Sequence, residues 1–80
     1  MAGAKVKYFI TDTEMLDILS EEEKNIIEMR LGIGSYDKKH TFQEICNELG
    51  CKTKAHASRV EERALGKLMR NNRKHIFYIV

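Results

Sequence analysis

The sequence contains no proline, only two cysteines, and no apolar run near the ~18 residues that a membrane-spanning helix requires. The lack of proline, together with 32% charged residues, favours a compact helical domain over a β-sandwich. Two cysteines are too few for a disulfide framework, and the N-terminal segment does not resemble a secretory signal peptide. We therefore expect a cytoplasmic protein that does not enter a membrane.

Catalytic chemistry is also missing from the sequence. No glycine-rich phosphate loop follows a strand, and no nucleophile stands beside an evident base. His40, Cys46, Cys51 and His56 fall within seventeen residues, but Cys46 lies on the apolar face of its expected helix, where a small buried residue is usual. His40 and His75 are expected at the surface. We expect no enzymatic activity, no metal and no cofactor.

The charge of the chain is unevenly distributed. Residues 1–49 hold six Lys/Arg against ten Asp/Glu, whereas residues 50–80 hold eight against two, within a net charge of +2. Such asymmetry is typical of a domain that meets a polyanion on its basic side. The alternative is that the acidic half balances a solvated basic helix, and charge alone does not separate the two.

Three residues are placed to start helices: Ser20, Thr41 and Thr53. Ser20 and Thr41 are each followed three residues later by a glutamate, Glu23 or Glu44, which is the pattern of a capping box. Apolar residues then recur at steps of three and four, as in amphipathic helices. The sequence therefore predicts an all-α domain, a bundle of four to five helices.

The expected helices over residues 41–49 and 53–70 are joined by a short turn that contains Gly50, which is a helix-turn-helix arrangement. A short helix capped by Thr11 or Thr13 is expected to precede them. The apolar tail HIFYIV is expected to pack back on the domain, with KVKYFI as a candidate partner, or else to form an exposed patch that binds a partner. The chain is accordingly divided into an N-terminal arm or short strand (1–10), a helical domain (11–72) containing the helix-turn-helix (41–70), and the tail (73–80).

Three segments, LSEEEKNIIEMRLGIG, HTFQEICNELG and RVEERALGKL, resemble region 4 of the sigma-70 family, the C-terminal domain of bacterial promoter-specificity factors. The resemblance covers residues 19 to about 72, and residues 72–79 resemble the short helix that follows in primary sigma factors. The anchors occur in the family's order: Leu19-Ser20, Arg30-Leu31-Gly32, Thr41, Glu44-Ile45, Leu49-Gly50, Val60-Glu61, Ala64-Leu65 and Lys67-Leu68.

The resemblance implies a non-enzymatic transcription domain in the bacterial cytoplasm, or a phage protein in a bacterial host. In that family the second helix of the helix-turn-helix reads the −35 promoter hexamer in the major groove, and another surface docks onto the flap of the RNA polymerase β subunit. The implied partners are promoter-like double-stranded DNA, the RNA polymerase core, and an anti-sigma factor or a partner chain that supplies other sigma regions. A monomer is expected.

The candidate DNA contacts follow from the basic residues and the resemblance together. Lysine and arginine side chains and the helix N-terminus suit phosphates, and Ser58 and Arg59 are expected where base edges would lie. The candidate residues are Thr41, Lys52, Thr53, Lys54, His56, Ser58, Arg59 and Arg63.

The recognition segment departs from the family at its base-reading positions. Lys54, Ala55 and Arg59 stand where the family has Arg, Glu and Gln, and one residue, Cys51 or Lys52, is extra in the turn. Ala55 cannot accept a hydrogen bond from a cytosine amino group, and Lys54 lacks the bidentate fork of arginine. We therefore expect the scaffold to persist and the −35 code to be altered or lost.

Two other functions fit the same residues. The first is a polymerase-binding adaptor or a phage or plasmid regulator, which docks on the β flap through the acidic N-terminal helices with little base reading. Met15, Ile18 and Met29 are its candidate apolar anchors, although the same residues suit a core. The second is a helix-turn-helix repressor that dimerises through HIFYIV and reads a palindrome, and its dimeric state would distinguish it from region 4.

Overall fold

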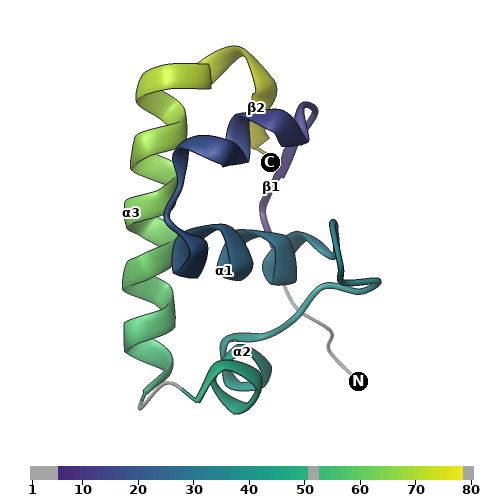
Figure 1. Cartoon of the computed structure of the whole chain (residues 1–80), viewed down its shortest axis with the longest axis vertical. Coiled ribbons are helices and arrows are strands. Elements are labelled where there is room, and N and C mark those ends of the chain that lie inside the picture. The colour runs from purple at the N-terminus through teal and green to yellow at the C-terminus, as the bar shows by residue number, and fades with distance from the viewer. Residues whose placement is uncertain (1–5, 51–52, 79–80) are drawn as a thin grey trace.

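The computed structural model describes residues 6–50 and 53–78 of the chain. Within these residues it contains three α-helices, two 3₁₀ helices and one small antiparallel sheet (Figure 1), which confirms the all-α prediction with the sheet as an addition. None of the helices among these residues is long and apolar enough to cross a membrane. The elements in chain order are β1 (Tyr8–Ile10), η1 (Thr13–Ile18), α1 (Glu21–Leu31), α2 (Phe42–Leu49), α3 (Lys54–Asn72), η2 (Arg73–His75) and β2 (Ile76–Tyr78).

Both predicted capping boxes are present. Ser20 Oγ accepts a hydrogen bond from the backbone N–H of Glu23 at 3.3 Å, and Glu23 Oε1 accepts one from the N–H of Ser20 at 2.9 Å. Thr41 and Glu44 make the same reciprocal pair at 3.2 and 2.8 Å. These bonds satisfy N–H groups that would otherwise lack a partner at the helix starts, and they define where α1 and α2 begin.

The helix η1 begins differently from the prediction. Asp12 is its N-cap, because the Asp12 carboxylate accepts the backbone N–H of Glu14 at 3.0 Å. The prediction of Thr11 or Thr13 as the cap is therefore wrong. Aspartate ranks among the strongest N-cap residues, so the short side chain between the two threonines takes this position.

The helix α3 runs along one side of the molecule, and η1, α1 and α2 all pack against it (Figure 1). Its buried positions Ala57, Val60, Ala64 and Leu68 follow the predicted steps of three and four. They contribute to two apolar clusters. One lies within the helix-turn-helix and α1: Ile26, Met29, Ile45, Cys46, Ala57 and Val60. The other joins η1, α1, α3 and the sheet: Val6, Tyr8, Met15, Leu16, Leu19, Ile27, Ala64, Leu68 and Ile76.

Two of the three expected apolar anchors belong to this core. Met15 and Met29 are buried, so their assignment to a docking surface is wrong. Ile18 alone of the three is exposed, with 46% of its surface accessible. The unbranched methionine side chains fill gaps between α1, α3 and their neighbours, which is a common use of this residue in cores.

The two ends of the described chain form an antiparallel ribbon, which consists of β1 and β2. Phe9 lies opposite Phe77 in its register. Val6 and Tyr8 point into the core, while Phe9 and Phe77 point outward. The continuous short helix expected over residues 72–79 is therefore wrong, because the single turn of η2 is followed by β2 at residues 76–78.

A buried polar network ties β1, α1 and α3 together. The Glu61 carboxylate accepts hydrogen bonds from Arg30 Nε and from the Tyr8 hydroxyl, both at 2.9 Å. Arg30 Nη1 donates to the backbone carbonyl of His40 at 3.0 Å, and the Arg30 guanidinium lies 4.1 Å from the centre of the Phe42 ring. His40 is buried by these contacts, so the surface position expected for it is wrong.

Candidate nucleic-acid interface

The N-terminus of α3 is formed by Thr53, as the sequence predicts. The Thr53 hydroxyl accepts a hydrogen bond from the backbone N–H of His56 at 3.2 Å. Ala57 and Val60 then anchor the first turns in the core, with no accessible surface. The start of α3 is therefore fixed against α1 and α2, while the side chains on its other sides meet solvent.

Ala55 and Arg59 lie opposite the buried row of α3, and Lys54 and Ser58 lie beside them. Lys54 and Ser58 are four residues apart, as are Ala55 and Arg59, so they form two adjacent rows on one face of the helix. Lys54, Ala55 and Arg59 are exposed and Ser58 is half-buried. We call these four residues the recognition face. It presents one ammonium, one guanidinium, one hydroxyl and one methyl group.

The remaining predicted contacts lie beside this face. Arg63 is exposed and lies one turn beyond Arg59 on the same side of α3. Thr41 is half-buried, and its hydroxyl is occupied by the α2 cap. Lys52 lies outside the described residues. The structure thus brings Lys54, Ser58, Arg59 and Arg63 together, with Thr53 at the helix start.

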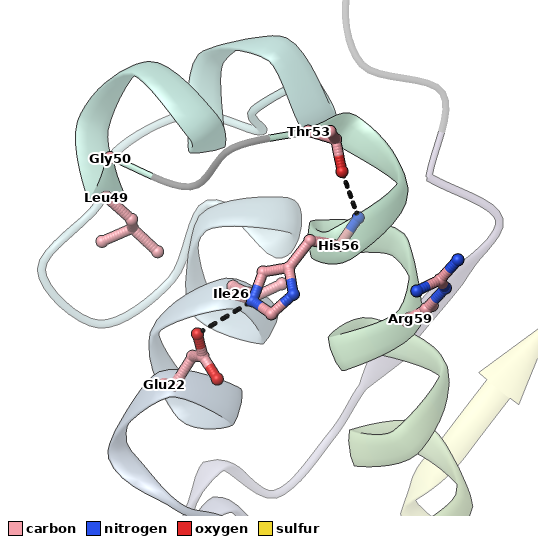
Figure 2. Close-up of a pocket in the computed structure, with 7 residues that line it drawn as sticks. All are labelled: Glu22, Ile26, Leu49, Gly50, Thr53, His56 and Arg59. Carbon is pink, nitrogen blue, oxygen red and sulfur yellow. Dashed lines mark hydrogen bonds and ion pairs between the residues drawn. The ribbon is translucent and has the colours of Figure 1, made fainter.

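His56 points away from the recognition face. Its Nε2 lies 3.2 Å from a carboxylate oxygen of Glu22 on α1, and Figure 2 shows the imidazole reaching across to that helix while Arg59 extends away from the pair. The ion pair joins α3 to α1 at an exposed position. Nothing in the sequence paired Glu22 with a residue 34 positions away.

A shallow hollow of about 530 Å³ adjoins this ion pair. The side chains of Ile26 and Leu49 form its apolar part, and Glu22, His56 and Arg59 form its polar rim (Figure 2). It lies where α1, the end of α2 and the start of α3 meet. The hollow therefore continues the surface of the recognition face toward the turn of the helix-turn-helix.

Two of the carboxylates near α3 are buried and form ion pairs with basic side chains of the same molecule. Glu61 is buried beside Arg30, and Glu23 is buried at 2.8 Å from Lys67 Nζ. Burial alone would raise the pKa of Glu23, but hydrogen bonds from Lys67 and Ser20 hold that pKa below its usual value. Glu62 remains as an exposed carboxylate on α3 itself. The exposed side chains of α3 therefore carry a net positive charge.

The chemistry of the recognition face suits nucleic acid. Arginine can donate two parallel hydrogen bonds to a guanine edge, serine can bond either a donor or an acceptor on a base, and an alanine methyl can contact a thymine methyl. Lysine supplies a point charge for a phosphate or a guanine. The positive end of the α3 dipole adds a further site for phosphate.

Comparisons with known proteins identify similar sequences over this region. The family model described as "Sigma-70, region 4" matches residues 15–70. The RNA polymerase sigma-28 factor of Bacillus thuringiensis subsp. kurstaki is 46% identical over 55 residues, which cover 69% of this chain and 22% of that protein. The chain thus spans about a fifth of the length of that relative. No solved structure matches the chain.

Proposed function

The chain belongs to the sigma-70 region 4 family, and from that membership we propose that it binds promoter-like duplex DNA through the N-terminal half of α3. At the coarser level it is a DNA-binding transcription domain without enzymatic activity, as its family is. The observation that carries the finer proposal is the recognition face, which gathers Lys54, Ser58 and Arg59 in two adjacent rows at the start of α3.

In this proposal α3 enters the major groove and the residues divide into two roles. Arg59, which is exposed opposite the buried row, and the half-buried Ser58 beside it contact base edges. Lys54, Arg63 and Lys52 contact phosphates, and the backbone N–H groups at the start of α3, next to Thr53, bind a further phosphate. Thr41 contributes through the start of α2, near the backbone of the duplex. His56 is held by Glu22 and acts indirectly, by fixing α3 on α1.

The base sequence that is read should differ from the −35 code of the family. Ala55 offers only a methyl group where the family has a glutamate, so a cytosine amino group finds no acceptor there. Arg59 adds a donor fork where the family has glutamine, which favours guanine. These two positions together support an altered specificity.

The second partner in this proposal is the RNA polymerase core, contacted by the N-terminal helices, with the β flap as its docking element. Support comes from Ile18, which is exposed among acidic side chains, and from a polar hollow lined by Asp17, Glu21 and Lys24 beside it. A partner chain would supply the sigma functions outside region 4, and an anti-sigma factor would compete for the same surfaces.

The test is a titration of labelled duplexes, one with a consensus −35 hexamer and one with a randomised library of hexamers, at about 50 and 200 mM salt. We expect enrichment of hexamers that differ from the consensus, and a preference that survives added salt. Arg59→Ala should reduce discrimination at one base position by about 5- to 150-fold. Arg70→Ala, an exposed arginine at the other end of α3, is the matched control and should leave it unchanged.

A second candidate function is the polymerase-binding adaptor with little base reading. The observation in its favour is that the recognition face contains Ala55 and borders the exposed Glu62, which repels phosphate. Equal binding to all hexamers, lost equally at high salt, would support this candidate and contradict base reading by Arg59.

A further inference from the structure

The ribbon carries a stacked aromatic pair on its outer face. The Phe9 and Phe77 rings lie 5.3 Å apart between their centres, with 17° between their planes. They are 46% and 45% exposed, and the neighbouring Tyr78 is 55% exposed. Large aromatic rings are usually buried, so this exposed pair forms an unusual surface, whereas Tyr78 pairs with Tyr8 and lies on the opposite face of the ribbon. Residues 15–70, which match the family, contain neither strand of this ribbon.

A basic hollow adjoins the aromatic pair. It is formed where α3 passes through η2 into β2, has a volume of about 430 Å³, and is lined by Arg70, Asn71, Arg73, Lys74 and His75. The backbone of His75 joins the hollow to the ribbon, because its carbonyl accepts the N–H of Thr11 at 3.0 Å. Among the residues described here, the side chains lining this hollow include no carboxylate.

The same face carries further positive charge just before β1. Lys7 is exposed and lies two residues before Phe9, so both side chains point to the outer face of the ribbon. Asp12 is the next acidic residue along the chain, and its carboxylate is turned to the N–H of Glu14 as the η1 cap. The outer face of the ribbon is therefore an aromatic pair flanked by cations.

A second copy of the chain fits this surface poorly. A symmetric contact between two ribbons would bring the two sets of Lys7, Arg73 and Lys74 toward one another, and like charges in contact are unfavourable. Two exposed rings also provide far less than the ~1,200 Å² that stable protein interfaces bury. The positive charge of the surface favours binding of a polyanion, and its aromatic rings favour contact with planar groups.

We propose that the outer face of the ribbon, with the adjoining basic hollow, binds single-stranded nucleic acid. Unpaired bases stack on Phe9 and Phe77, and the phosphates that link them lie against Arg73, Lys74 and Lys7. Duplex DNA hides its base faces and cannot use the rings, whereas a single strand offers both groups along its length. Figure 1 places the ribbon near the end of α3 remote from α2, so this site is separate from the recognition face.

The test measures fluorescence anisotropy of labelled oligothymidine and oligouridine, each of about 12 nucleotides, with the whole chain. Preference for one of the two distinguishes DNA from RNA as the natural strand. Phe77→Leu retains an apolar side chain but removes the π face, and it should weaken binding by about tenfold. The double variant Arg73→Gln/Lys74→Gln leaves the ribbon intact and should reduce the slope of log affinity against log salt by up to about 1.4.

The control variant is Lys54→Ala, which lies on the recognition face and should leave the affinity for single strands unchanged. Circular dichroism shows whether each variant remains folded. Absence of binding by the unaltered chain would overturn the proposal, as would a loss caused by Lys54→Ala and not by Phe77→Leu. A concentration-dependent dimer that Phe77→Leu dissociates, without single-strand binding, would assign the surface to a second copy and also overturn it. So would an acidic peptide that binds the ribbon while oligonucleotides do not.

Discussion

Two adjacent glutamates on α3 have opposite environments. Glu61 is buried and accepts hydrogen bonds from Arg30 and Tyr8, whereas Glu62 is exposed. Burial and the neighbouring Glu61 carboxylate raise the pKa of the Tyr8 hydroxyl, which therefore stays protonated and donates to Glu61. Arg30 depends on Glu61 for charge compensation, since both side chains have left water.

Glu61→Gln should destabilise the domain strongly. It leaves the Arg30 guanidinium buried without a counter-charge, which costs about 3–5 kcal/mol. A domain of this kind has about 5–15 kcal/mol in total, so a large share of its free energy of unfolding would be lost. Urea denaturation followed by circular dichroism measures the change.

Glu62→Gln is the matched control, because the same substitution at an exposed neighbour should change stability by less than about 0.5 kcal/mol. Equal effects of the two substitutions would show that the buried pair contributes nothing specific.

At this scale the sequence predicted the local contacts and missed the distant ones. The partners of the capping boxes are three residues apart, so local spacing indicated them. Glu61 and Arg30 are 31 residues apart, and the sequence contains no signal for that pairing. The same is true of His56 and Glu22, whose contact supports the proposal that His56 acts by fixing α3 on α1.

Among the elements, α1 and α2 end in the same way but in different surroundings. Gly32 and Gly50 both adopt the left-handed conformation, with φ of 67° and 70°. A Cβ on Gly32 would lie 2.7 Å from the backbone carbonyl carbon of Lys38, whereas a Cβ on Gly50 would meet no atom of the described residues within 4 Å. The loop after α1 is thus packed against its helix end, whereas the described residues leave space beside Gly50.

Gly32→Ala should therefore cost more than Gly50→Ala. Both substitutions carry the left-handed strain of about 1–2 kcal/mol, but only the first also displaces backbone atoms of the loop. Thermal unfolding of the two variants measures the difference directly. A larger loss for Gly50→Ala would mean that the turn of the helix-turn-helix, and not the α1 loop, is the tightly packed one.

The helices were more predictable than the strands. Each helix has its own start signal and an apolar repeat, which a local pattern reveals. β1 and β2 are three residues each and pair across almost the whole chain, so KVKYFI alone could indicate a strand or an extended arm. The misassigned helix after α3 has the same cause, because the β2 residues reveal their partner only in the fold.

Considered as a whole, the molecule separates its charge along α3. Acidic side chains gather on η1 and α1, and exposed basic side chains follow α3 and η2. The uneven distribution of charge along the sequence is therefore also present on the surface of the folded domain. It favours a domain that binds anions on one side and another macromolecule on the other.

We predict that the isolated protein is a monomer. Sedimentation equilibrium over a hundredfold range of concentration should give a constant mass of 9.3 kDa. The basic outer face of the ribbon repels its own copy, and the apolar core is already covered by the ribbon. A dimer would contradict this and would favour the palindrome-reading repressor.

The pairing of β1 with β2 also decides how the domain responds to force. The two strands run antiparallel, so the chain enters and leaves the domain at the same end of the ribbon. Tension applied through a longer polypeptide at both ends would therefore pull the strands apart one residue pair at a time, as a zipper opens, instead of shearing all pairs at once. The ribbon would yield first, while the helix-turn-helix at the other end of α3 stays assembled.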